Sequence, residues 1–241
     1  MERDRRGRFL VGRLLRLNCG LAAAALLVAA PVAKPAGVAL RTPIAIGIVD
    51  SGIGSVDPTG HGSAVAAVLN AALGRGSWAR VRSYPDLNRA GFAQPRLMAA
   101  AIRAAAAAGA RLVNISQTIK GRAPRVRRAI AAAPDVLFVV AAGNEGLDLD
   151  APGLERDPCS DPAPNLICVA ATTSRGGPLA RFSNRGRGSV DAAAPGAGTS
   201  FAAPRVTAGA ARLLWRHPDR PVAGLRRETI SRFPLPGERT R

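Results

Sequence analysis

Short apolar runs alternate along the chain with longer alanine-rich segments, and this alternation constrains the fold more than any other feature. Runs with the length and β-branched composition of buried strands occur at residues 44–49, 111–116, 136–142 and 166–171, with a weaker one at 79–83. Helices are predicted at residues 61–73, 94–108, 124–133, 200–215 and 221–232. This order predicts an α/β fold, a mostly parallel β-sheet with helices on both faces in a three-layer sandwich. Sites on such sheets form at the carboxyl ends of the strands.

The first 33 residues have the composition of a targeting segment. Residues 1–16 carry six arginines and two acidic residues, whereas residues 19–33 are uncharged and end in small residues. This run is shorter than the roughly 20 residues of a membrane span and is typical of a secretory signal peptide, with an uncleaved signal anchor as the alternative. We therefore expect a secreted or periplasmic protein, with a short linker at 34–43, one domain at 44–235 and a basic tail at 236–241.

The net charge of +18 at pH 7 raises the question of a nucleic-acid partner. Lys34 and Lys120 are the only lysines, so 32 of the 34 cationic residues are arginines, as a high-GC codon bias would produce. Six Phe, two Trp and one Tyr are too few for a protein that stacks on single-stranded bases, and no basic stripe with interleaved aromatics occurs. We expect no nucleic-acid partner, no membrane contact beyond a signal anchor, and a monomer.

The cysteines and the acidic residues do not have the spacing of a metal site. Loss of the signal segment would leave Cys159 and Cys168, an even pair that we expect to form a disulfide in an oxidising compartment; two thiols are the alternative. The acidic residues Asp148, Asp150 and Asp157 are interpreted as a solvated loop rather than a calcium site. We expect no metal and no cofactor.

Four polar residues lie at the ends of predicted elements. Asp50 ends the first strand, His61 begins the first helix, Asn144 follows the most apolar strand, and Ser200 opens the long helix near the C-terminus. Each residue alone is more often a turn residue, a packing histidine or a helix cap. His217 is the only other histidine and thus the only competing base. Taken together, an Asp, a His and a Ser at the ends of different elements indicate a nucleophilic site.

These residues stand in motifs that resemble those of the subtilases, the subtilisin-like serine peptidases, and the matches span most of the chain from residue 44 to about 215. The matching segments are IAIGIVDSGI (44–53), GHGSAVAAVL (60–69), RLVNIS (111–116), FVVAAGNEG (138–146), ICVAATTS (167–174), ARFSNRG (180–186), DAAAPG (191–196) and GTSFAAPRVTAG (198–209). The serine motif with Ala-Ala-Pro is the most specific, and the chain order Asp, His, Ser is that of subtilisin.

The resemblance implies a subtilisin-like fold and a serine endopeptidase that acts on proteins or peptides. Asp50 would hold the imidazole of His61, and His61 would take the proton of Ser200 as its hydroxyl attacks. The Asn144 amide would donate to the oxyanion, together with backbone N–H groups at the helix start.

The resemblance also places the substrate along one strand edge. Ser116, Gln117 and Thr118 stand where the family commonly has Ser-Leu-Gly, so the preferred substrate side chain is open. Gly143, like Gly198, would let the backbone approach the substrate closely.

The chain departs from the family at three connections. Asp50 and His61 are only 11 residues apart, the stretch before Ser200 is cut to residues 197–199, and only ten residues separate Ala33 from the first strand, where longer relatives carry a propeptide. These deletions favour an alternative hypothesis, a catalytically weak or inactive subtilase-like protein that binds or depends on a partner.

Overall fold

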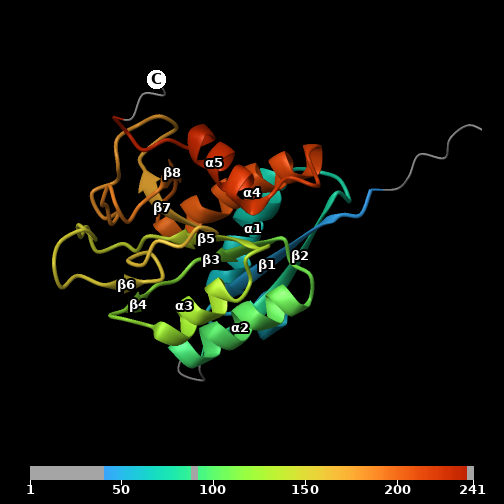
Figure 1. Ribbon diagram of the computed structural model, residues 1–241, viewed down its shortest axis with the longest axis horizontal. Helices are drawn as coiled ribbons and strands as arrows, with labels where there is room; N and C mark the ends of the chain where they lie inside the picture. The colour runs from blue at the N-terminus through green and yellow to red at the C-terminus, as the bar shows by residue number, and fades with distance from the viewer. Residues whose placement is uncertain (1–40, 88–91, 238–241) are drawn as a thin grey trace, which may run out of the picture. The chain divides into compact units, whose positions relative to one another are not determined.

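A computed structural model describes residues 41–87 and 92–237 (Figure 1). The expected signal segment, nearly all of the expected linker and the end of the basic tail lie outside the described residues. Within the described ranges, no helix is long and apolar enough to cross a membrane.

Six parallel strands form the central sheet, and the sequence predicts five of them. Their order across the sheet is β2 (Ala79–Pro85), β1 (Ile44–Asp50), β3 (Leu112–Ile115), β5 (Leu137–Ala141), β7 (Leu166–Thr172) and β8 (Ala192–Pro195). Strand β8 is not among the predicted strands, because alanine has a low β-propensity and its pattern could not separate a strand from a loop. Its pairing with β7 at the sheet edge makes it a strand.

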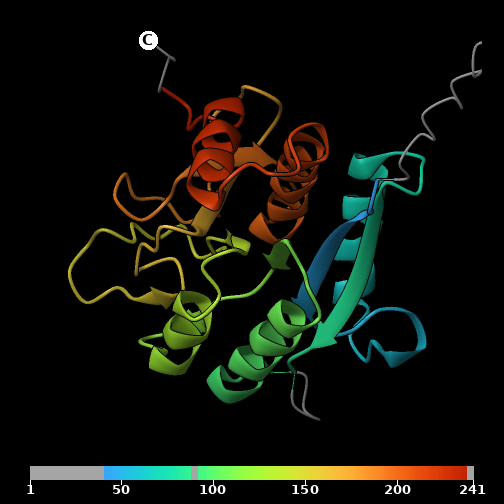
Figure 2. The same ribbon diagram turned by 45° about the vertical axis from the view of Figure 1, so that its right-hand side comes forward.

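Helices cover both faces of the sheet (Figures 1 and 2). The helices are α1 (His61–Leu73), α2 (Pro95–Ala107), α3 (Pro124–Ala131), α4 (Thr199–Arg216) and α5 (Val222–Arg232), with a short 3₁₀ turn at Gly54–Val56. Helices α1 and α4 pack on one face and α2 and α3 on the other, so two separate apolar cores flank the sheet. The predicted three-layer α/β sandwich is confirmed.

The central strands are mostly apolar, and β5 is apolar at every position, because both faces of the sheet are buried. In β5, Leu137 and Val139 contribute to the core under α1 and α4, whereas Phe138 and Val140 contribute to the core under α2 and α3. Each fully buried side chain of this size stabilises the fold by about 1.5–3 kcal/mol. The sheet is therefore a rigid platform whose carboxyl edge can hold side chains in fixed positions.

A second, small antiparallel sheet corrects one expectation from the sequence. Strand β4 (Ile119–Lys120) pairs with β6 (Arg156–Asp157). Asp157 is 0% exposed; its Oδ2 accepts the backbone N–H of Ala123, and its carboxylate pairs with Arg127 at 2.6 Å. The interpretation as a solvated loop is therefore wrong for Asp157, because an arginine 30 residues away in the sequence supplies the counter-charge.

The segment after β6 is also tied to the central sheet. A disulfide joins Cys159 to Cys168, which lies in β7, and both cysteines are fully buried. This cross-link closes a loop of about ten residues, for which the chain-entropy model gives a stabilisation of somewhat under 3 kcal/mol.

Candidate active site

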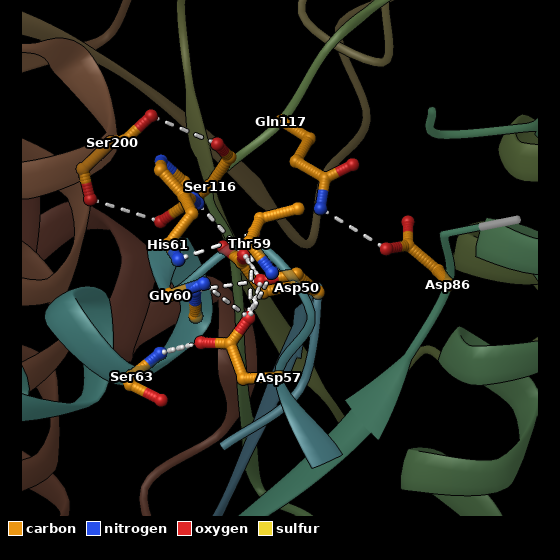
Figure 3. Close-up of polar contacts among 12 residues, drawn as sticks. Asp50, Asp57, Thr59, Gly60, His61, Ser63, Asp86, Ser116, Gln117 and Ser200 are labelled. Carbon is orange, nitrogen blue, oxygen red and sulfur yellow. Dashed lines mark hydrogen bonds and ion pairs between the residues drawn. The ribbon is translucent and has the colours of Figure 1, made fainter. Parts of the chain in front are cut away.

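Three of the side chains that the sequence singles out, those of Asp50, His61 and Ser200, lie together at the carboxyl edge of the sheet (Figure 3). Asp50 is the last residue of β1, His61 is the first residue of α1, and Ser200 is the second residue of α4. Asn144 follows β5 by three residues. Parallel strands bring their carboxyl ends to one edge, which is why residues far apart in the sequence meet here.

Asp50 and His61 are hydrogen-bonded. His61 Nδ1 lies 2.7 Å from Asp50 Oδ1, and Asp50 is 0% exposed. Because a carboxylate only accepts hydrogen bonds, Nδ1 carries the proton and Nε2 is the basic nitrogen. The hydrogen bond to Asp50 raises the pKa of His61 against the opposing effect of burial, and the charges of Asp50 and Asp57 raise it further.

The ten-residue connection between these two residues is organised around Asp57. Its carboxylate accepts hydrogen bonds from Ser51 Oγ at 2.6 Å, Ser63 N at 2.7 Å, Gly60 N at 2.9 Å and Thr59 N at 3.2 Å. Burial would raise the pKa of Asp57, but these hydrogen bonds, led by that from Ser51, outweigh it and hold the pKa well below its ordinary value. The carboxylate is thus an ionised hub that fixes the turn (Figure 3).

Ser51 links this hub to both members of the Asp–His pair. Its N donates to Asp50 Oδ1 at 2.7 Å. Its Oγ, which donates to Asp57, lies 3.2 Å from the same Asp50 oxygen and accepts the N–H of Gly62, the residue after His61. A Cβ at Gly62 would lie 2.1 Å from the carbonyl oxygen of Gly52, so the first turn of α1 packs directly on the turn after β1. The short connection is therefore compatible with an Asp–His pair. The sequence analysis missed Asp57, although Asp-Pro-Thr-Gly before a helix is a turn signal.

Ser200 lies beside the imidazole but points its hydroxyl elsewhere. Its Oγ donates to the carbonyl oxygen of Ser116 at 2.9 Å, and Ser116 Oγ donates back to the carbonyl oxygen of Ser200 at 3.0 Å. No hydrogen bond joins Ser200 Oγ to His61 among the described residues. The ring of Phe201, the next residue, is 6.0 Å from the imidazole, so the two elements are in contact range. A hydrogen bond between a catalytic serine and its base is often long or poorly aligned when no substrate is bound.

The Asn144 side chain is oriented by Thr199, the residue before Ser200. Asn144 Oδ1 accepts hydrogen bonds from Thr199 N at 2.8 Å and from Thr199 Oγ1 at 3.0 Å, and Thr199 Oγ1 accepts the N–H of Gly143 at 3.1 Å. A backbone N–H only donates, so the amide atom that faces it is the oxygen. Asn144 is exposed, and its two amide N–H donors have no hydrogen-bond partner among the residues that the structure describes.

Comparison with known proteins identifies the family. The model of the Subtilase family matches residues 45–233. The chain belongs to the subtilase family. Among solved structures, the nisin leader peptidase NisP from Lactococcus lactis matches this subtilase with a TM-score of 0.65 and 19% identity over 78% of this chain and 83% of that chain. The S41 psychrophilic protease matches with a TM-score of 0.62 and 26% identity over 77% of this chain and 81% of that chain.

MycP1 with its N-terminal propeptide removed is also similar, with a TM-score of 0.60 and 25% identity over 75% of this chain and 80% of that chain. None of the curated proteins compared with the chain matches it. The likeness to NisP is at the level of the fold, whereas the family match covers the segments that carry all four polar residues. The expected membership in a family of serine peptidases is confirmed.

In this subtilase, Gly143 shapes the loop that carries Asn144. Gly143 has φ +100°, and a Cβ there would lie 2.5 Å from Asn184 Nδ2. Asn184 Nδ2 donates to the Ala142 carbonyl oxygen, and its Oδ1 accepts the N–H groups of Glu145 and Leu147. The close approach at Gly143 is thus to Asn184. Asn184 stands in one of the matching motifs, but no role could be predicted for it, because its hydrogen bond to Ala142 joins residues 42 positions apart.

The expected substrate edge is backed by a buried carboxyl group. Gln117 Nε2 donates to Asp86 Oδ1 at 3.1 Å, and Asp86 is 1% exposed. Burial, and then the charge of Asp50, raise the pKa of Asp86 to about 7. Asp86 Oδ2 and Gln117 Oε1 are buried and have no hydrogen-bond partner among the described residues. Thr118 is half-buried. Asp86 was missed because one Asp after a weak strand has the sequence signal of a turn.

His217 does not compete as the base. It is the C-cap of α4, and Ser200 is the second residue of the same 18-residue helix. A helix of this length is about 27 Å long, so His217 lies at the opposite end from Ser200. Within the described ranges, no three His, Cys, Asp or Glu side chains are grouped as metal ligands.

Proposed function

We propose that this subtilase is a serine endopeptidase that hydrolyses peptide bonds in proteins or peptides with Asp50, His61 and Ser200 as its triad. The observation that carries the proposal is the hydrogen bond of 2.7 Å from His61 Nδ1 to Asp50. It leaves the basic nitrogen of His61 available next to the start of α4, where Ser200 lies. A buried carboxylate in this position orients the ring and stabilises the imidazolium that forms during proton transfer.

In the proposed reaction, Ser200 Oγ turns from the Ser116 carbonyl toward His61 Nε2. His61 takes the hydroxyl proton as Oγ attacks the peptide carbonyl, and then gives this proton to the leaving amine. A water molecule then attacks the acyl-enzyme in the same way, with His61 again as the base, and Ser200 is released. This rotation of the Ser200 hydroxyl replaces one neutral hydrogen bond with another. A bond of that kind contributes only about 0.5–1.5 kcal/mol, so binding of a substrate can supply the free energy needed for the rotation.

The oxyanion would be stabilised by two groups of donors. The first is the amide nitrogen of Asn144, whose oxygen is held by Thr199. The second is the set of backbone N–H groups in the first turn of α4, which have no partner inside the helix. Donors fixed before the reaction cost no reorganisation when the charge develops.

The side-chain preference of the proposed peptidase would be set at the edge formed by residues 116–118, against which an extended substrate would pair. Gln117 is held by Asp86, so its side chain has a fixed position at this edge. Ser116 instead exchanges two hydrogen bonds with Ser200, each hydroxyl donating to the carbonyl oxygen of the other residue. We expect Gln117→Leu and Thr118→Gly to change which peptides in a library are cut.

A second candidate function is a subtilase-like protein with little or no turnover that binds or requires a partner. The hydrogen bond from Ser200 Oγ to Ser116, away from His61, favours it. In this case the triad residues would be present without a competent nucleophile, and a partner would be needed to turn Ser200.

A fluorophosphonate probe separates the two candidates. It labels a serine only when the adjacent base activates it. We expect the full chain to be labelled and to digest unfolded protein, with both signals lost in Ser200→Ala. If a folded parent chain reacts with no probe and cuts no unfolded protein, the second candidate replaces the first.

The proposed location is outside the cytoplasm, either secreted or periplasmic, or anchored by the N-terminal segment. The buried pair Cys159 and Cys168 supports this proposal, because disulfides persist in oxidising compartments. Non-reducing mass spectrometry of exported protein, with N-terminal sequencing, tests the pairing and a mature start near Lys34.

A further inference from the structure

A groove lined by arginines opens between two helices on one face of the sheet. Helices α2 and α3 lie side by side there (Figures 1 and 2). The cavity between them has a volume of about 440 Å³. Alanines of both helices line it together with the four groove arginines, which are Arg96 and Arg103 on α2 and Arg125 and Arg128 on α3.

The groove arginines have no counter-charge. All four are exposed, and none of their guanidinium groups has an ion pair or hydrogen bond within the described part of the chain. Neither α2 nor α3 contains an Asp or a Glu. The neighbouring arginines are different: Arg127 pairs with Asp157 and Asp161, and Arg122 pairs with Glu155. Four positive charges without a counter-charge therefore line one cavity.

The groove begins at the edge of the sheet that carries the proposed triad. Each helix follows the carboxyl end of a strand, so its first turn lies at that edge. Arg96 and Arg125 are each the second residue of their helix. Arg103 lies about two turns, or roughly 10 Å, farther along α2. A polypeptide bound at the carboxyl edge could thus extend into the groove.

We propose that the arginine groove binds an acidic segment of the polypeptide substrate, outside the cleavage site. This inference rests on the proposed peptidase function. Guanidinium groups pair with carboxylates through two parallel hydrogen bonds, and a cavity of several hundred cubic ångströms accommodates a short peptide segment. A concave site between helices suits one chain better than a flat bilayer. Neither helix has an aromatic residue on which nucleic-acid bases could stack.

Binding is measured on the full chain with Ser200→Ala, so that no peptide is cut. The probes are a fluorescent peptide of alternating Glu and Ala and the same peptide with Gln in place of Glu. We expect the acidic peptide alone to bind, with an affinity that falls as salt is added. Substitution of the four groove arginines by Gln should raise its Kd about tenfold, because four charge pairs are lost together.

The matched control removes the same charge elsewhere. Arg75, Arg80, Arg175 and Arg216 are exposed and lie outside the groove, and their joint substitution by Gln should change Kd by less than about twofold. Equal weakening in both variants would overturn the proposal, because net charge alone would then explain the binding. Tighter groove-dependent binding of an oligonucleotide or of phosphatidylglycerol vesicles than of the peptide would also overturn it.

A cleavage assay links the groove to the peptidase. A peptide substrate with an acidic extension should have a higher KM in the groove variant than in the parent, with kcat unchanged, whereas a neutral extension should show no difference. Fluorophosphonate labelling of the parent is scored separately. Failure of labelling refutes the peptidase, while loss of the groove effect in a labelled, active protein refutes only the groove.

Discussion

The two halves of the candidate site differ in how completely they are assembled. In the acid–base half, formed by Asp50, His61 and the connection 51–60, the hydrogen bond that would orient the proposed base is already present. In the nucleophile half, formed by Asn144, Thr199 and Ser200, the amide is oriented but the serine hydroxyl is bonded to Ser116. Both halves follow connections that are short for the family, so length alone does not explain the difference.

The difference follows from the number of hydrogen bonds that fix the central polar group of each half, which is the Asp57 carboxylate in one and the Ser200 hydroxyl in the other. The ionised carboxylate of Asp57 accepts several donors at once and so fixes a turn of ten residues. The hydroxyl of Ser200 has one proton and rotates about one bond, so a single hydrogen bond determines where it points. A short connection can therefore position a base rigidly and still leave a nucleophile free to turn.

The largest effect is expected from Asp50→Asn. An amide at this position can donate to Nδ1 of His61, which would place the proton on Nε2 and remove the basic nitrogen from the side of Ser200. We expect kcat to fall by about 10⁴ with little change in the melting temperature. Steady-state kinetics on a peptide substrate, with circular dichroism as the check on folding, measure both. A variant with a tenth or more of the parent kcat would show that the acid–base half is not used.

Asn144→Ala tests the nucleophile half and should have the next largest effect. The amide would stabilise charge that develops only in the transition state, so kcat should fall by about 10²–10³ while KM stays nearly unchanged. Thr199→Val removes the hydroxyl that donates to Asn144 Oδ1 and accepts the N–H of Gly143. It should give a smaller loss of kcat, since the backbone N–H of residue 199 still orients the amide. A KM effect without a kcat effect would contradict the oxyanion role.

Asp57→Asn should have a moderate effect that is visible in the pH profile. The charge of Asp57 contributes to the raised pKa of His61, and the base must be neutral to act. Removal of this charge should move the acidic limb of kcat/KM to lower pH, with a loss of about tenfold at the optimum from a loosened turn.

Asp150→Asn is the matched control for Asp57→Asn. Asp150 is also a loop carboxylate with a lowered pKa, held by hydrogen bonds from Gly188 N and Ser189 Oγ, but it lies in a loop away from the triad. Its substitution should change stability and leave the pH profile in place. If both variants shift the profile equally, Asp57 has no specific influence on His61.

Local patterns in the sequence predict the main elements and the four polar residues. Alternating strands and helices set the α/β sandwich, because burial on both faces requires apolar residues at every position of strands such as β5. The triad candidates could be found because each stands within a contiguous motif. The predicted helix start places His61, and the apolar run ending at Ala142 places Asn144 to within a few residues.

The residues that sequence analysis missed act through contacts between distant segments. Asp157 looks solvated until Arg127 folds next to it, and Asp86 looks like a turn residue until Gln117 covers it. Asn184 holds the loop before Asn144 from 40 positions away. Burial and pairing of a polar group depend on the tertiary structure, so a single sequence carries no local signal for them.

The smallest effect on catalysis, and a clear one on stability, is expected from Asp86→Asn. Asp86 follows β2, and its N–H donates to the carbonyl oxygen of Asp50 at 3.1 Å, so two buried carboxyl groups lie at the start of the acid–base half. Burial and the charge of Asp50 raise the pKa of Asp86 from 3.8 to about 7. The unfolded chain therefore releases this proton at lower pH than the folded chain does.

The sign of the pH dependence follows from this order. Between pH 4 and 7 the folded chain binds more protons at Asp86 than the unfolded chain, so the free energy of unfolding of the parent should fall as pH rises through this window and level off above about pH 7. A tenfold change in proton affinity corresponds to about 1.4 kcal/mol, so the loss should reach a few kcal/mol. Asn cannot ionise and can still accept the hydrogen bond from Gln117. We therefore expect Asp86→Asn to be more stable than the parent at pH 8 and to lack this fall, as urea unfolding at pH 5 and pH 8 would measure. Equal slopes in parent and variant would mean that Asp86 is ionised in the folded protein, and that the acid–base half tolerates two adjacent buried charges.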